Sequence, residues 1–196
     1  MTNQSQANKS RKPTKSPKIN VRTLTLSAML MASSVVIGIL CKNFFTFGIY
    51  YRITFENLPI LLCGMLFGPV MGMLAGAGAD IISCLCSTNP NVNPVITLGA
   101  MTVGLLAGLC FRMIPKTHPR LRLIAAVAIS HLIGQVAIKS VAKILFFGMP
   151  FFGCFIGLGI SAVVGTLEAL AIRLLLQKRI FANYTDTLSA ERKQEP

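Results

Sequence analysis

Six apolar runs, separated by short polar or proline-containing breaks, fill most of the chain. They cover residues 24–40, 57–67, 70–86, 95–113, 123–145 and 155–176. A helix of about 20 apolar residues crosses the ~30 Å hydrocarbon core of a bilayer, and most of the runs approach that length. The run at 57–67 is shorter and ends at Gly68-Pro69, so it predicts a short helix. The pattern predicts an all-α polytopic membrane protein, a six-transmembrane-helix bundle.

The composition supports this class and excludes most others. Apolar residues make up 53% of the 196 residues and charged residues 13%, with a mean hydropathy of +0.65. Soluble domains carry about a quarter charged residues, so a soluble enzyme is excluded. Residues 1–21 predict a disordered basic cytoplasmic tail, residues 22–177 a transmembrane substrate-binding domain, and residues 178–196 a cytoplasmic C-terminal tail.

The net charge of +13 raises the question of a nucleic-acid partner, and the positions of the basic residues answer it. Fifteen of the 19 lysines and arginines flank apolar runs: Lys9, Arg11, Lys12, Lys15, Lys18, Arg22, Arg112, Lys116, Arg120, Arg122, Arg173, Lys178, Arg179, Arg192 and Lys193. An even number of spans places all of these segments on one side, as the positive-inside rule expects of cytoplasmic segments. The charge therefore predicts a multi-pass cell-membrane protein with both termini in the cytoplasm and no nucleic-acid partner.

No motif for catalysis or nucleotide binding is present. The chain lacks the phosphate-binding string G-x-x-x-x-G-K-S/T, the dinucleotide-binding string G-x-G-x-x-G, and the H-E-x-x-H and G-x-S-x-G strings of hydrolases. Two histidines, His118 and His131, do not make a metal cluster. We therefore expect no enzyme, no metal and no cofactor in this chain, and energy for transport has to come from a gradient or from another subunit.

The informative polar residues are those that topology does not explain. Four cations fall in the predicted outer half: Lys42, Arg52, Lys139 and Lys143. Facing them are Glu56 and, near mid-membrane, Asp80. The excess of positive charge fits capture of an anionic ligand. The alternative is that Arg52 and Glu56 form an ion pair while the lysines extend to the outer headgroups.

A polar stripe runs along the fifth apolar run. His131, Gln135, Lys139 and Lys143 are spaced four residues apart, so on an α-helix they form one slowly winding line. Polar groups in a membrane span usually face a cavity or the interior of the bundle. The stripe therefore predicts one wall of a pocket that opens outward, although a single histidine such as His131 is more often a structural hydrogen-bonding residue.

Two outer segments are further candidates. Asn89 and Asn93 lie in a proline-stiffened loop and offer hydrogen-bond donors and acceptors, unless the loop is an ordinary turn. The aromatic segment that contains Phe44 and Tyr51 either stacks on a flat ligand or forms an interfacial belt.

Several strings resemble those of one transporter family. These are Arg52-Ile-Thr-Phe-Glu-Asn-Leu-Pro-Ile, Gly64…Gly68-Pro69, Asp80 and Asn93-Pro94…Thr97-Leu98-Gly99. With six short spans and a basic N-terminal tail, they resemble the S components of energy-coupling factor (ECF) vitamin transporters, and most closely the folate-specific members. The resemblance covers roughly residues 22–177. The three short strings are moderately specific to the folate group, whereas S components for other vitamins share the architecture.

The resemblance implies a membrane subunit that captures folate or a related vitamin from outside. It then docks on a shared module of one transmembrane protein and two ATPases, which use the ATP. In the family an A-x-x-x-A motif on the first helix contacts the transmembrane partner, and here it matches Ala28-Met-Leu-Met-Ala32. Small residues four apart let helix backbones approach closely.

Pattern and resemblance together give the predicted substrate-binding residues: Phe44, Tyr51, Arg52, Glu56, Asn57, Asp80, Asn89, Asn93, His131, Gln135, Lys139 and Lys143. The two carboxylates of folate would meet Arg52, Lys139 and Lys143 at the outer mouth. The pterin would point towards Gln135, Asp80 and the asparagine loop. The alternatives are an S component for another vitamin and a stand-alone secondary carrier of a small organic anion.

Overall fold

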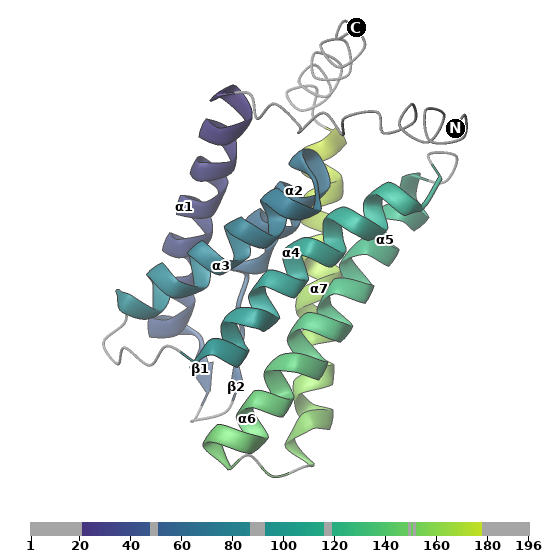
Figure 1. Ribbon diagram of the computed structural model, residues 1–196. Helices are drawn as coiled ribbons and strands as arrows, with labels where there is room; N and C mark the ends of the chain where they lie inside the picture. Colours follow the sequence, from purple (N-terminus) through teal and green to yellow (C-terminus); the bar gives the residue numbers. More distant parts are fainter. Residues whose placement is uncertain are drawn as a thin grey trace, which may run out of the picture.

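The computed structural model describes residues 21–47, 51–86, 93–115, 119–148, 150 and 152–177. The elements are α1 (Val21–Phe44), β1 (Thr46–Phe47), β2 (Tyr51–Arg52), α2 (Asn57–Phe67), α3 (Pro69–Leu85), α4 (Pro94–Met113), α5 (Pro119–Ser130), the π-helix η1 (His131–Ile138), α6 (Lys139–Phe147) and α7 (Gly153–Gln177). The start of α1 and the end of α7 lie at one end of the bundle, here called the terminal end (Figure 1). The hairpin and α6 lie at the other, the hairpin end.

The helical architecture agrees with the prediction, and one small sheet adds to it. Within the described residues, four helices are long and apolar enough to cross a membrane: Val21–Phe44, Pro94–Met113, Leu121–Phe146 and Gly153–Leu175. The other two apolar helices, α2 and α3, are shorter. The aromatic segment, predicted either to stack on a flat ligand or to form an interfacial belt, contains the antiparallel pair β1–β2, in which Thr46 pairs with Arg52 and Phe47 with Tyr51.

Helices α2, α3 and α4 are packed backbone to backbone. A Cβ built at Gly64 or Gly72 would overlap the carbonyl oxygen of Gly104, and one built at Gly104 would overlap that of Gly72. Small residues therefore bring these helices close, as expected from their spacing. The turn between α2 and α3 is made by Gly68 at φ 110°, a conformation that favours glycine, and α3 then begins at Pro69.

The fifth predicted span is one continuous rod of three parts, α5, η1 and α6 (Figure 1). Its middle, His131–Ile138, is π-helical. In a π-helix the hydrogen bonds run from i to i+5, so a turn takes more than four residues. The rod ends at Gly148, whose φ of 63° is left-handed and whose amide donates to the carbonyl of Lys143.

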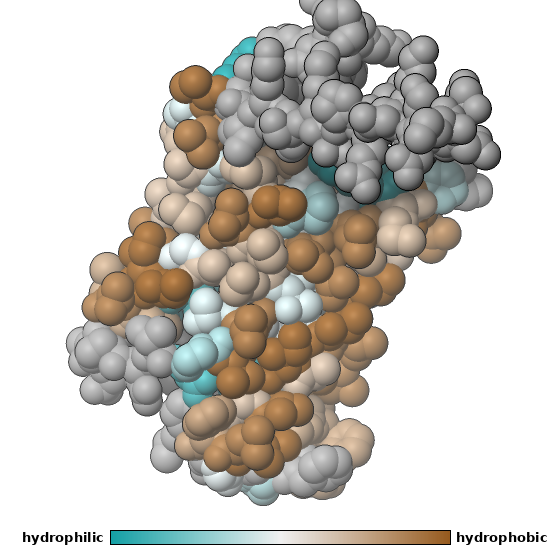
Figure 2. Space-filling view, viewed as in Figure 1, coloured by the Kyte–Doolittle hydropathy of each residue, from teal (hydrophilic) through white to brown (hydrophobic). Residues whose placement is uncertain are grey.

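The apolar core lies between α2, α4, α5 and α7. Its buried members are Leu61, Leu62, Met65, Val103, Ala107, Leu123, Ala126, Val127 and Ile172. Much of the outer surface is also apolar, as Figure 2 shows for one face, and large side chains such as Leu74 and Val163 are more than half exposed. A surface of this kind suits a hydrocarbon environment and not water.

Candidate functional site

A polar cleft lies in the hairpin-end half of the bundle, between the rod and α7. It is lined by Thr54, Asn57, His131, Gln135, Ser140, Lys143, Gly157, Ile160, Ser161 and Val164. Asn57, His131, Gln135 and Lys143 were predicted as substrate-binding residues, and the structure brings these four together. The wall on α7 and the contributions of Thr54 and Ser140 were not predicted.

The cleft is narrow in this structure. Its volume of about 70 Å³ is well below the ~300–1,000 Å³ of typical small-molecule sites. Two apolar grooves flank α7, one against the hairpin segment and one against α5 and η1, with volumes of about 620 and 300 Å³. Apolar grooves therefore lie on both sides of α7 beside the cleft.

Asn57 places an unused amide in the cleft. It is the first residue of α2 and is 1% exposed. Its side-chain oxygen and nitrogen are both buried and have no hydrogen-bond partner among the described residues. Burying an unpaired amide costs about 1–3 kcal/mol. A ligand that offers both a donor and an acceptor would satisfy it.

His131 is held by an acid that the sequence analysis did not assign. Its Nε2 lies 2.7 Å from Oε2 of Glu168 on α7, and both side chains are buried. The other ring nitrogen, Nδ1, has no partner in the described part of the chain, and neither does the Oγ of Ser161. An ionisable residue inside a predicted span is by itself a signal of function, and this signal could have identified Glu168.

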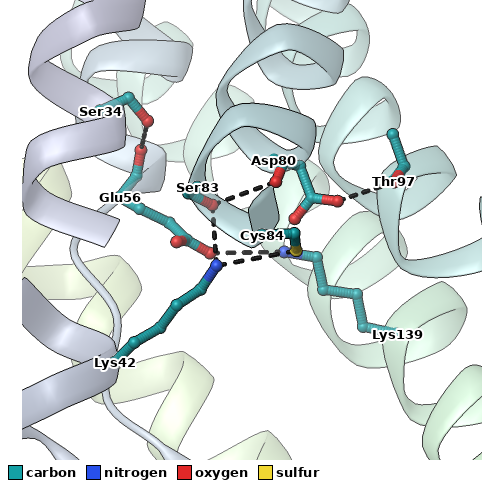
Figure 3. Close-up of polar contacts among 8 residues, drawn as sticks. All are labelled: Ser34, Lys42, Glu56, Asp80, Ser83, Cys84, Thr97 and Lys139. Carbon is teal, nitrogen blue, oxygen red and sulfur yellow. Dashed lines mark hydrogen bonds and ion pairs between the residues drawn. The ribbon is translucent and has the colours of Figure 1, made fainter. Parts of the chain in front are cut away.

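A second polar cluster joins α1, the α2 start, α3, α4 and the rod (Figure 3). Its charged members are two cations, Lys42 and Lys139, and two acids, Glu56 and Asp80. Nζ of Lys139 lies 3.8 Å from Oε1 of Glu56, and Nζ of Lys42 donates to the Oγ of Ser83, 2.8 Å away. The charges in this described cluster balance.

Hydroxyl groups complete this cluster. Thr97 donates to Oδ2 of Asp80 over 2.8 Å, and Ser83 donates to the Asp80 carbonyl over 3.1 Å. Ser34 on α1 donates to the backbone carbonyl of Glu56 over 2.5 Å. A Cβ at Gly38 would stand 2.7 Å from Oε2 of Glu56, so the glycine makes room for that carboxylate.

The structure therefore separates residues that the predicted stripe put in one line. Lys143 lines the cleft, whereas the described lining residues do not include Lys139. Lys139 is 7% exposed, and its stem packs against Gly99, where a Cβ would lie 2.8 Å from its Cγ. Glu56 and Asp80 lie in the second cluster with it. Three of the four stripe residues, His131, Gln135 and Lys143, thus line the cleft, and Lys139 reaches Glu56 instead.

The remaining predicted residues lie at the edges of the described structure. Asn93 caps α4, because its Oδ1 accepts from the amide of Val95 over 3.0 Å. Phe44 is 75% exposed. Asn89 and the side chains of Tyr51 and Arg52 lie outside the described residues.

The predicted docking residues lie on the surface of α1. Ala28 and Ala32 are exposed, whereas Ser27, Ser34 and Val35 are buried. The small-residue face thus points away from the bundle.

Three comparisons place the chain among known proteins. It matches the family model of the ECF transporter, substrate-specific component, over residues 22–187. Its fold is similar to a crystal structure of FolT bound with folic acid, with a TM-score of 0.68 and 22% sequence identity, over 82% of this chain and 95% of that chain. A Mycoplasma pneumoniae protein described as an uncharacterised MG098 homologue is 30% identical over 115 residues. The match takes in 55% of this chain, and the chain spans 24% of that relative's length.

The family match covers most of the chain and confirms the resemblance to the S components of ECF transporters. Together with the long apolar helices, it indicates a multi-pass membrane protein. The chain belongs to the family of substrate-specific components of ECF transporters.

Proposed function

We propose that the chain is the folate-binding membrane subunit of an ECF-type transporter, and that it captures folate from outside the cell. The observation that carries the proposal is the cleft, which combines an amide, an imidazole and an ammonium group in a fold similar to that of FolT bound with folic acid. Lys143 suits the carboxylates of the glutamate moiety. The paired donor and acceptor of Asn57 suit the amide-like edge of a pterin.

The proposal includes a full crossing by six spans with both termini in the cytoplasm. The paired ends of α1 and α7 at one end of the bundle support it (Figure 1). Arg112 and Arg122 support it too. At the close of α4, Arg112 donates to the carbonyl of Phe67 over 3.4 Å. At the start of α5, Arg122 lies over the ring of Phe111, 3.7 Å from its centroid. The positive-inside rule places such a basic corner in the cytoplasm.

Delivery requires partners. In this scheme the exposed small-residue face at Ala28 and Ala32 packs against a transmembrane subunit, and two ATPase subunits supply the energy. This chain itself then uses no cofactor. The family membership and the exposure of the two alanines support this arrangement.

The test is to purify the chain alone and to identify what it binds. Mass spectrometry of the co-purified ligand, followed by radioligand binding across folate, riboflavin and thiamine, is expected to select folate. Tight binding of another vitamin in place of folate would refute the assigned substrate. Vesicles that contain only this chain are expected to bind folate without ATP and without accumulating it, whereas accumulation would indicate a secondary carrier.

A further inference from the structure

The His131–Glu168 pair is a buried acid–base pair beside the cleft. Its two side chains are 6% and 0% exposed, and the Nε2–Oε2 distance of 2.7 Å is that of a strong hydrogen bond. Among the described residues, the ion pair that Glu168 makes is the one with His131. Lys139 and Glu56 of the neighbouring cluster both act electrostatically on Glu168, but with opposite signs, and because they pair with each other they add little net charge at this site.

The protonation state of this pair follows from the cost of a buried charge. One proton lies between Nε2 and Oε2, on either the imidazole or the carboxyl group. With the shared proton alone, the pair would have a net charge of −1 at a buried site, which is expensive. A second proton makes the pair neutral, and its two possible sites are Nδ1 of His131 and Oε1 of Glu168, both buried without a partner among the described residues. Imidazole is the stronger base, and His131 lines the cleft whereas the described lining does not include Glu168. Nδ1 is therefore the site that takes the proton, and it becomes a hydrogen-bond donor.

The Nδ1–H donor of His131 lies where a bound ligand can accept its hydrogen bond. His131 lines the cleft next to Asn57 and Ser161, and its Nδ1 is buried without a protein partner in the described structure. A donor that stays unsatisfied in a buried site is costly, as is the unpaired amide of Asn57. The start of the π-helix at His131 also fits a functional position, because π-turns are frequent at such sites.

We propose that Glu168 is a positioning residue which keeps His131 protonated at Nδ1, and that this N–H donates to the 4-oxo oxygen of a bound pterin. Asn57 then pairs with a neighbouring donor and acceptor on the same heterocycle. The identity of the ligand rests on the proposed function, whereas the protonation state of His131 does not. The Nδ1–H donor thus favours a pterin that has an oxo group at position 4 over one that has an amino group there.

The first experiment measures the protonation state in the ligand-free protein. The chain has two histidines, so the ring nitrogens of ¹⁵N-histidine-labelled protein give few signals. The H118Q variant identifies those of His131. A protonated Nδ1 is expected, and replacing Glu168 by leucine should change the ring signals of His131 and leave those of His118 as they were. An unprotonated Nδ1 in the wild-type protein would overturn the proposal.

The second experiment measures selectivity with folic acid and its 4-amino analogue, in which the acceptor oxygen is replaced by a donor. The wild-type protein is expected to bind folic acid roughly 10- to 100-fold more tightly. The H131F/E168Q variant removes the donor without leaving a buried charge, so the two affinities should become similar. Gly165→Ala is the matched control, because its Cβ would lie an ordinary 3.5 Å from the His131 ring. It should keep the wild-type preference.

The outcomes separate the two proposals. An unchanged preference in H131F/E168Q would overturn the role of His131, even if folic acid binds tightly. Failure of the wild-type protein to bind folic acid would overturn the proposed function, and the nitrogen spectrum would still decide the state of the buried pair.

Discussion

Lys139 and Lys143 are one helical turn apart, yet they lie in different surroundings. Lys143 lines the cleft, and Lys139 is buried against Glu56. Removing each of them should therefore have a different effect, one on ligand binding and the other on the stability of the fold.

Replacing Lys143 by glutamine should weaken folate binding. A lost charge-assisted hydrogen bond costs about 1.5–3 kcal/mol, or roughly 10- to 100-fold in affinity. Pteroic acid, which lacks the glutamate moiety, should lose much less. Calorimetric titration of both ligands checks this. An equal loss for both would show that Lys143 meets the pterin or supports the fold.

Replacing Lys139 by methionine should lower the free energy of unfolding, by up to ~3–5 kcal/mol, because it removes the buried cation that lies 3.8 Å from the carboxylate of Glu56. The double variant K139M/E56Q removes both charges and should recover part of the loss. Thermal unfolding in detergent checks which of the two variants is the more stable. A double variant less stable than K139M would contradict an ion pair between these residues.

At the residue scale, the sequence predicted which residues lie in the site better than it predicted which side chains pair with each other. Asn57, His131, Gln135 and Lys143 were predicted in the site and meet in the cleft. Glu168 was not assigned to the site, because it is 37 positions from His131 and no spacing rule joins two separate spans. The partner of Glu56 could not be derived either, because side-chain pairing across a bundle depends on the relative rotation of the helices.

Among the elements, α3 and α4 carry the tightest contact, and α7 the loosest. Gly104 touches the backbone of Gly72, whereas no described atom lies within 4 Å of a Cβ built at Gly157. Interiors tolerate added volume poorly, but an open helix face tolerates it well.

Gly104→Ala should therefore destabilise the protein, by about 1–3 kcal/mol, as overpacked cores do. Gly157→Ala is the matched control, and it should be neutral or slightly stabilising because alanine is the better helix former. Unfolding temperatures of the two variants in the same detergent check this. Equal stability of the two variants would mean that α3 and α4 separate without cost.

The hairpin-end half of α7 should move outward when a ligand enters the narrow cleft. Spin labels at Ile156 and Leu98, both exposed, measure the distance from α7 to α4, in a background without the native cysteines. This distance should increase on addition of folate. A second label pair at Leu170 and Leu109 reports on the terminal-end half, where Ile172 is fully buried, and should stay constant. An unchanged Ile156–Leu98 distance would place the opening elsewhere.

Helix boundaries followed well from the hydrophobic pattern, whereas helix geometry did not. The run predicted at 57–67 is α2, Asn57–Phe67, because Gly68 and Pro69 fix its end. The π-helical segment His131–Ile138 has no periodic signal, since the apolar pattern that predicts a helix assumes 3.6 residues per turn. The two-residue strands at Thr46 and Tyr51 are too short for any alternation to appear.

For the whole molecule, the exposed face of α1 is where a partner would bind. Ala32→Leu should abolish folate uptake by the assembled transporter, because a larger side chain prevents close helix approach. Folate binding to the isolated chain should remain, since Ala32 is exposed on α1 and is not one of the cleft-lining residues. Val163→Leu, on the exposed surface of α7, is the control and should transport normally. Full uptake by the Ala32→Leu variant would exclude this face as the docking surface.

The unequal helix lengths have a consequence for the surrounding lipid. Helix α1 has 24 residues and spans ~36 Å, whereas α3 has 17 and spans ~26 Å. With α3 as one of the six proposed spans, its exposed apolar side chains, such as Val70 and Leu85, meet a hydrocarbon layer of ~30 Å that is thicker than the helix. In that arrangement the lipid leaflets compress beside α3, at a cost of fractions of a kcal/mol per ångström. A partner that covers this flank of α3 relieves the elastic deformation of the lipid. The affinity of the chain for such a partner therefore depends on the thickness of the membrane.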